Sequence, residues 1–209
     1  MIIRRDLLQG SAAWLAARAS IPTASEMGNL LTPKFAIREG QMPATYLAQK
    51  IAEKLMGGPL LSFSSGEMEQ GEILEDYALP WLALEYDYDI ERVGMCMRDD
   101  GRAACSPDGI INGNMGLEIK CMQPVNHVKC LMTNAVPEEY LIQIHTGLYI
   151  TGFQSWLFVA YHRKLPKFVR EVKRSEAVNA QIHEALTNFL ERFDEALERL
   201  QPQAALTEK

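Results

Sequence analysis

The segment from Cys105 to Cys121 constrains the fold more than any other part of the chain, because it has the pattern of a β-hairpin. The dipeptide Asn112-Gly113 lies between two apolar runs, which is a strong hairpin signal. Side chains of a strand alternate between its faces, so Glu118 and Lys120 share one face and the apolar residues between them share the other. The hairpin therefore places two charged side chains next to each other.

The length of the loop decides whether a third charged residue joins them. A two-residue turn at that dipeptide would pair Asp108 with Leu117, which lies on the apolar face. A three-residue loop that adds Asn114 pairs Asp108 with Glu118 instead, and opposed or diagonal neighbours then lie roughly 5 to 8 Å apart. We predict the three-residue loop, because it gathers both carboxylates and the lysine into one site.

This grouping suits a hard divalent cation. Mg²⁺ takes oxygen ligands and keeps several waters, so one or two carboxylates are enough to hold it. A bound metal acidifies its water, and a lysine beside it can orient a nucleophile or neutralise developing charge. The order Pro107-Asp108, then Glu118-Ile119-Lys120, matches the signature of the PD-(D/E)XK nucleases. Taken alone the pattern is loose, and the alternative is a surface ion pair on an edge hairpin.

Three further segments accompany this pattern in a fixed order. They are Trp14–Ser25, Gly71–Glu75 and Tyr140–His145. Together with 106–109 and 116–121, they resemble the λ exonuclease and YqaJ-like viral recombinase family over roughly residues 10–160. The set as a whole is highly specific for that family, whereas the charged triplet is not.

The resemblance implies an α/β fold with a restriction-endonuclease-like PD-(D/E)XK core, in which helices flank a mixed central β-sheet. It also implies a phage or prophage enzyme, a Mg²⁺-dependent 5′→3′ exonuclease on double-stranded DNA ends, for which Mn²⁺ would substitute. Such an enzyme releases 5′-mononucleotides and leaves 3′ single-stranded tails for recombination. Family members form ring-shaped homotrimers and work with a single-strand annealing protein, so we expect both here.

By the same resemblance, Asp108, Glu118 and the backbone carbonyl of Ile119 hold the metal, and Lys120 positions the attacking water. Glu75 would reach the two metal-binding carboxylates from a helix, either at a second metal or through water. The alternative for Glu75 is an ordinary exposed glutamate.

Three more residues are placed near the reaction by the resemblance. Gln143 has apolar neighbours on its helix, so its amide needs a specific partner, and the family uses this glutamine at the active site. Met68 corresponds to an apolar residue near the duplex fork, where it would act as a wedge. His145 replaces a common family glutamine, and we assign it no role.

A second group of residues implies recognition of a DNA end. By resemblance, Arg18 holds the 5′-phosphate, and the hydroxyls of Ser25 and Ser106 assist. A helix N-terminus at Thr23 would add free N–H groups. The alternative for Arg18 is a cation at the end of its own helix. For Trp14 we favour core packing over base stacking.

Composition is compatible with a DNA enzyme without indicating one. The 209 residues are 47% hydrophobic, enough for one domain over residues 1–209 with a substantial core. The net charge of −6 gives no basic footprint, although a local basic channel can coexist with an acidic exterior.

The chain carries no pattern for a zinc site or a membrane span. None of the four cysteines has C-x₂-C spacing, so we expect reduced thiols and a location in the cytoplasm of a bacterial host. Arg4-Arg5 resembles a twin-arginine export signal, but the residues that follow are too polar. No window of 18 or more apolar residues occurs, so no membrane contact is expected.

Periodicity and breakers predict the remaining elements. Thr23 and Glu26 fit a capping box that opens a helix through Leu31. The expected helices are about 12–19, 24–31, 44–56, 71–86 with a kink at Pro80, 138–150 and an amphipathic C-terminal helix of about 175–200. The expected strands lie within 89–97 and 103–121, over 155–161, and over 168–172 at an edge.

Two other functions stay open at this point. An endonuclease could use the same core, although it needs no pocket for a terminal phosphate such as Arg18 would form. A DNA-binding or assembly module could keep the fold without catalysis, although the intact charged triplet argues against it.

Overall fold

The computed structural model describes residues 1–60 and 77–204, with side chains through residue 200. Its centre is a five-stranded sheet in the order β2-β5-β6-β7-β8. Strands β6 and β7 are parallel and the other neighbours are antiparallel, so the predicted mixed central sheet is confirmed. The strands of this sheet are Ile90–Glu91 (β2), Gly109–Ile111 (β5), Met115–Lys120 (β6), Ser155–Ala160 (β7) and Phe168–Lys173 (β8). Strand β8 is at the edge, as predicted.

A smaller sheet stands beside the central one. It has the order β1-β3-β4 and is antiparallel throughout. Its strands are Ile2–Arg4 (β1), Met95–Met97 (β3) and Ala104–Cys105 (β4). Strand β1 was not predicted, because three residues before a polar turn carry too little pattern to indicate a strand.

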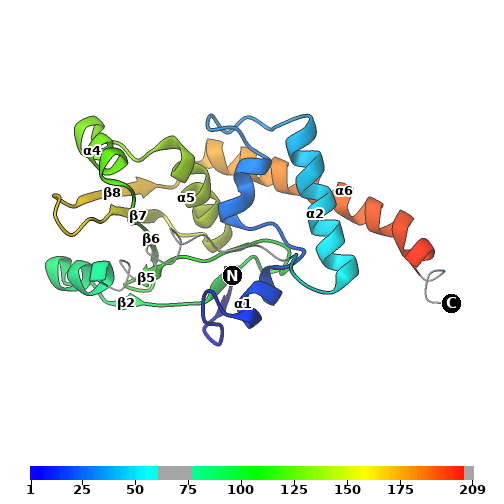
Figure 1. The fold of residues 1–209 in the computed structure, drawn as a ribbon, viewed down its shortest axis with the longest axis horizontal. Helices are drawn as coiled ribbons and strands as arrows, with labels where there is room; N and C mark the ends of the chain where they lie inside the picture. Colours follow the sequence, from blue (N-terminus) through cyan, green and yellow to red (C-terminus); the bar gives the residue numbers. More distant parts are fainter. Residues whose placement is uncertain (61–76, 205–209) are drawn as a thin grey trace.

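Helices cover both faces of the central sheet (Figure 1). Helix 77–86 packs with Leu79 and Leu82 on the face that carries Leu117 and Ile119. On the other face lies α5, and α6 packs against both α5 and α2. The helices are Ala12–Arg18 (α1), Gln41–Met56 (α2), Pro124–Thr133 (α4), Glu138–Thr151 (α5) and Glu176–Ala204 (α6). The predicted helix over 71–76 and its Glu75 lie outside the described residues.

One predicted helix is wrong. Residues Ala24–Asn29 form a 3₁₀ helix (η1), and the Thr23 side chain makes no capping bond to a backbone N–H. Its hydroxyl donates to the carboxylate of Glu26 instead, at 2.7 Å. Gly28 and Asn29 are poor helix formers, and Pro33 disfavours a helical conformation just before it, so a longer α-helix does not develop. With only this short turn at Thr23, the structure has no helix N-terminus there for a phosphate.

Two further helices differ from the predictions. Helix α2 begins at Gln41, three residues before the predicted Ala44. Pro43 fits inside its first turn, where backbone N–H groups have no partner within the helix. Helix α4 was missed, although Pro124 at its first turn and Asn134 in a left-handed conformation at its end are the usual signals for such a helix.

The cysteines and the described helices add two findings. All four cysteines are free thiols. Among the described helices, none is both long enough and apolar enough to span a bilayer.

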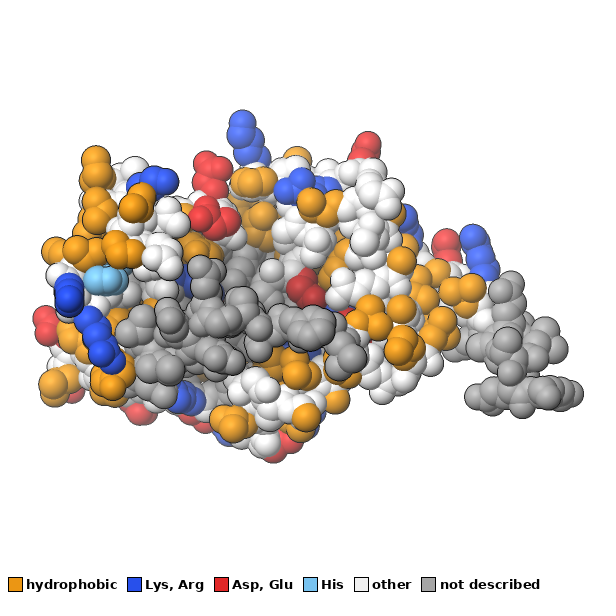
Figure 2. All heavy atoms as spheres, viewed as in Figure 1, with side chains coloured by type: hydrophobic (Ala, Val, Ile, Leu, Met, Phe, Trp, Pro, Cys, Tyr) orange, Lys and Arg blue, Asp and Glu red, His pale blue; other side chains and the backbone are white. Residues whose placement is uncertain are grey.

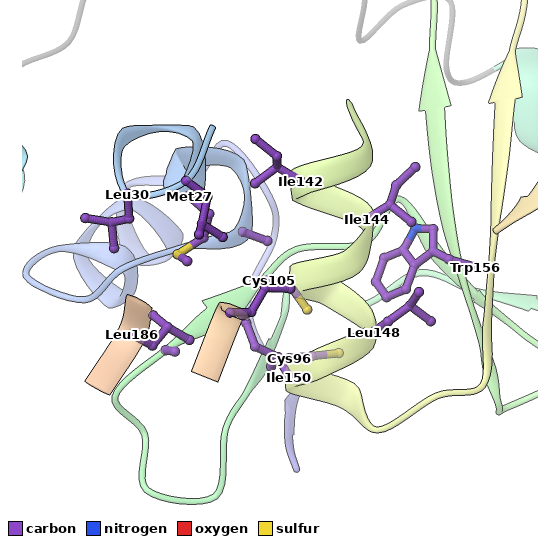
Figure 3. Close-up of a cluster of buried hydrophobic side chains, with 14 of the residues drawn as sticks. Met27, Leu30, Cys96, Cys105, Ile142, Ile144, Leu148, Ile150, Trp156 and Leu186 are labelled. Carbon is purple, nitrogen blue, oxygen red and sulfur yellow. The ribbon is translucent and has the colours of Figure 1, made fainter. Parts of the chain in front are cut away.

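The position of α5 depends on one buried indole. Trp156 of β7 is 2% exposed, and an added Cβ at Gly116 of β6 would lie 2.2 Å from its ring. An added Cβ at Gly147 of α5 would lie 2.6 Å from the same ring. Figure 3 shows Trp156 on one side of α5, with Met27 and Leu30 beyond the opposite side. The two glycines therefore let the indole seat α5 close to the sheet.

We predict that Gly116→Ala lowers the free energy of unfolding by about 2 kcal/mol or more, since the new methyl overlaps a ring that cannot move within a packed core. Urea unfolding measures this loss. Gly58→Ala is the control, because nothing lies within 4 Å of its added Cβ, and its change should stay within about 0.5 kcal/mol. Equal stability of the two variants would contradict the role given to Trp156.

Candidate active site and anion pocket

The hairpin has the predicted three-residue loop. Ile111 pairs with Met115, and Gly109 pairs with Leu117. The regular pairing ends at Gly109: the Asp108 N–H also donates to the Leu117 carbonyl, at 3.0 Å, and the Asp108 side chain lies beside the Glu118–Ile119 stretch of β6. Asn112 and Gly113 hold φ angles of 49° and 74°, a conformation that these two residue types tolerate well.

The charged triplet converges as expected. An Asp108 carboxylate oxygen accepts the backbone N–H of Ile119 at 2.5 Å. The Lys120 ammonium lies 2.7 Å from a Glu118 oxygen. The side chain of Glu118 is 2% exposed and that of Lys120 is 30% exposed, so the pair is not an ordinary surface ion pair. The lysine lies between the buried carboxylate and solvent.

Gln143 completes this group from α5. Its amide nitrogen donates to Glu118 Oε1 at 2.7 Å, so the predicted specific partner of this glutamine is the central carboxylate. Burial raises the pKa of Glu118, while the Lys120 ammonium and the Gln143 amide act in the opposite direction. Gln143 lies one helical turn before Gly147, so the seating of α5 on Trp156 also brings this amide to the strand.

Tyr140 is a neighbour of the site that the sequence did not assign. Its ring stacks on Phe158 with centroids 5.6 Å apart, and the Lys120 ammonium lies 5.5 Å from its centre. A cation over an aromatic face is attracted by about 0.5 to 2 kcal/mol. Tyr140 therefore helps to restrain the lysine.

The donor set fits a hard divalent cation. Asp108 and Glu118 present carboxylate oxygens, and a bound cation would favour the charged form of the buried Glu118. Within the described ranges, no three His, Cys, Asp or Glu side chains gather as a metal cluster. The third candidate, Glu75, lies outside those ranges, as does Met68.

The second predicted group is also brought together. A terminal nitrogen of Arg18 donates to the hydroxyls of Thr23 and Ser25, both at 3.1 Å. The guanidinium lies 4.1 Å from the centre of the Trp14 ring. The indole N–H is shared between the Gly94 carbonyl at 2.9 Å and Ser106 Oγ at 3.1 Å, so Trp14 connects Arg18 to Ser106.

This arrangement favours an anion. An indole N–H can only donate, so Ser106 accepts from it and keeps its own hydroxyl proton for another acceptor. Arg18 likewise can only donate, and its contacts in the group are neutral hydroxyls. Trp14 also packs against the small-sheet core of Leu7, Met95 and Ala104, so the favoured packing role is supported. Its bridging role was not predicted.

The two carboxylates near this group share one lysine. The Lys50 ammonium lies 3.1 Å from Glu26 and 3.1 Å from Glu53, and its side chain is 4% exposed. The Tyr46 hydroxyl also donates to Glu26, at 3.1 Å. Across the described part of the chain, no ion pair joins Arg18 to a carboxylate. Burial lowers the pKa of Arg18, and the charge of Glu26 acts in the opposite direction.

His145 lies apart from both groups. It is buried, its ring meets Phe35 edge-on at 5.2 Å, and burial lowers its pKa. These contacts give it a packing role.

Comparisons with known proteins agree with this geometry. The family model of the YqaJ-like viral recombinase domain matches residues 13–154. The structure of LHK-Exo in complex with dAMP has a TM-score of 0.83 and 27% identity, and the match covers 94% of this chain and all of the other. A second structure of this alkaline exonuclease, from Laribacter hongkongensis, has a TM-score of 0.82, 27% identity and the same coverage.

A more distant structure supports the fold alone. It is a phage-related exonuclease from Haemophilus somnus 129PT, with a TM-score of 0.64 and 10% identity over 86% of this chain and 96% of that one. No curated protein matches the sequence. Together the family model and the structures support a nuclease role and the predicted PD-(D/E)XK-like fold.

We predict that Glu118→Ala weakens Mn²⁺ binding by about tenfold or more, since it removes a proposed ligand, whereas Lys120→Ala leaves binding within a few-fold. Titration followed by Mn²⁺ electron paramagnetic resonance measures both. Circular dichroism checks that each variant folds. Equal binding by wild type and Glu118→Ala would place the metal elsewhere.

Proposed function

The chain belongs to the YqaJ-like viral recombinase family, and on that basis we propose that it is a metal-dependent exonuclease that degrades one strand of duplex DNA from its 5′ end. It would release 5′-mononucleotides and leave a 3′ single-stranded tail for phage recombination. The observation that carries this proposal is the link from Arg18 through Trp14 to Ser106, because it joins an anion pocket to the hairpin that bears Asp108.

The spacing suits removal of single nucleotides. Ser106 precedes Asp108 by two residues, which span at most about 7 Å. Phosphates along one DNA strand follow each other at about 3.4 Å of helix rise. A terminal phosphate at Ser106 and a scissile phosphate at Asp108 would therefore belong to neighbouring or nearly neighbouring nucleotides. An endonuclease has no use for such a terminal pocket.

The proposed reaction assigns a task to each residue. Mg²⁺, or Mn²⁺ in its place, would be held by Asp108, Glu118 and the Ile119 carbonyl, with Glu75 as a further carboxylate. When bound, such a cation lowers the pKa of a coordinated water and offsets charge on the phosphate.

The protein's own groups then position the reactants. Lys120 orients the attacking water and holds positive charge beside the scissile phosphate. Gln143 fixes the orientation of Glu118 through its hydrogen bond, and Tyr140 fixes Lys120. Arg18, Ser25 and Ser106 bind the terminal phosphate, which sets the distance to the bond that is cut.

The rest of the proposal comes from the family resemblance. We place the protein in the cytoplasm of a bacterial host, as one exonuclease domain over residues 1–209. Three copies would form a ring around double-stranded DNA, and a single-strand annealing protein would take up the tail. Met68 would act as the wedge at the duplex fork.

We predict that Lys120→Ala reduces the rate of nucleotide release by at least about a hundredfold, because it removes the group that orients water and opposes charge. Release of acid-soluble nucleotide from linear duplex measures the rate. Lys129→Ala, at an exposed position of α4, should retain wild-type activity. Activity of Lys120→Ala within a few-fold of wild type would exclude the assignment.

The Arg18 prediction separates an exonuclease from an endonuclease. Arg18→Ala and removal of the substrate 5′-phosphate should each slow digestion by about ten- to a hundredfold, since a charge-assisted hydrogen bond contributes roughly 1.5 to 3 kcal/mol. The two losses should not add, because both delete one interaction. Arg18→Lys should recover only part, since lysine lacks the planar fork.

The four combinations of enzyme and substrate form the experiment, with Arg192→Ala on α6 as the control. Losses that multiply would show that Arg18 acts elsewhere, for example on the duplex backbone.

A further inference from the structure

The loop of residues 161–167 between β7 and β8 concentrates positive charge in an acidic chain. It carries three cations, Arg163, Lys164 and Lys167, while the whole chain has a net charge of −6. Figure 1 shows the tip of this β7–β8 hairpin at the left end of the molecule, and Figure 2 shows Lys and Arg side chains gathered at the same edge.

These cations differ from several others in the protein. Arg4, Arg5, Arg98, Arg102 and Arg174 each pair with a carboxylate. Within residues 1–60 and 77–204, no carboxylate forms an ion pair with Arg163, Lys164 or Lys167. Their charge is therefore available to a phosphate.

The loop is held at several points. His127 of α4 donates through Nε2 to the Pro166 carbonyl at 2.7 Å. The Arg163 guanidinium lies 3.9 Å from the centre of the Tyr77 ring, and the Lys167 ammonium lies 5.3 Å from the centre of the Tyr161 ring. These contacts fix the cations without neutralising them, so less conformational entropy would be lost when they bind.

The loop begins beside β6, the strand that carries Lys120. Lys120 pairs with Ala160, and the Tyr161 N–H donates to the Lys120 carbonyl at 3.0 Å. Arg163 follows Ala160 by three residues, so it lies within about 10 Å of chain length from that pair. Measured along a duplex axis, at about 3.4 Å of rise per nucleotide, that length is at most about three nucleotides.

Strand order fixes the side on which the loop stands. The order β5-β6-β7 places Asp108 and the Ser106 pocket on one side of Lys120, and the loop on the other. On the proposed function, the terminal 5′-phosphate occupies the Ser106 side. A DNA strand that runs across the edge of the sheet from the Ser106 pocket passes the position of the bond that is cut and then reaches the loop.

We propose that the loop 161–167 binds phosphates of the degraded strand on the 3′ side of the bond that is cut, through Arg163, Lys164 and Lys167. The assignment to the 3′ side rests on the proposed function, which sets the polarity of the DNA strand. The loop would hold the rest of the DNA strand while each nucleotide is released.

The test is equilibrium binding by Arg163→Gln/Lys164→Gln in Ca²⁺, which binds oxygen ligands in a looser geometry and is expected not to support turnover. Fluorescence anisotropy follows a 5′-phosphorylated 12-nucleotide single strand and a blunt duplex across 50–200 mM salt. For the single strand, the log–log salt slope should fall by about 1.4, since two contacts at roughly 0.7 each are removed. A 5′-phosphorylated dinucleotide competitor is too short to reach the loop and should bind both proteins equally.

Lys54→Gln/Arg192→Gln, with the same change in net charge on exposed positions of α2 and α6, is the matched control. Its salt slope should equal that of wild type, and thermal unfolding should show all three proteins equally folded. An equal slope for the loop variant and the control would overturn the proposal. A loss confined to the duplex, or one shared by the dinucleotide, would overturn the assignment to the 3′ side of the degraded strand.

Failure of this inference is separable from failure of the proposed function. If the function is wrong, the wild-type protein shows no preference for 5′-phosphate over 5′-hydroxyl ends. If only the loop assignment is wrong, that preference persists in wild type and in the loop variant.

Discussion

The pairing of β5 with β6 is the constraint on which the candidate site depends. Because side chains alternate along a strand, a shift by one residue would turn Asp108 toward the Leu117 face and away from Glu118. The three-residue loop prevents that shift. The seating of α5 on Trp156 then encloses Glu118 and adds the Gln143 amide, so the central carboxylate is buried while its lysine stays in contact with solvent.

A protein with a net negative charge can still present an anion site where individual cations are not paired with carboxylates. Lys50 pairs with both Glu26 and Glu53, and in the described part of the chain the neighbouring Arg18 forms no ion pair with a carboxylate. Trp14 fixes the same arginine through its ring and fixes Ser106 through its N–H. Net charge therefore says little about this site, because the field that a ligand meets depends on which cations remain unpaired.

Sequence patterns predicted the features that depend on residues close together in the chain. The hairpin followed from Asn112-Gly113, but its three-residue loop was chosen because that register gathers the charged side chains. Helices α5 and α6 followed from apolar periodicity, and β7 from a continuous apolar run. The turn at Thr23 was predicted wrongly, because its side chain bonds Glu26, which is itself held by Lys50 and Tyr46 from α2. The roles of Trp14 and Lys50 were missed for the same reason. Each depends on partners that are distant in sequence, and the periodicity of a segment gives no information about such partners.

The central claim is that the chain recognises a DNA end before it cuts. The most direct measurement is digestion with Mg²⁺ of one plasmid in two forms, linear with 5′-phosphorylated ends and covalently closed without nicks. The account predicts steady release of 5′-mononucleotides from the linear form and none from the circle. Cleavage of the circle as fast as the linear form would contradict it and indicate an endonuclease, and an inert protein on both forms would indicate a module without catalysis.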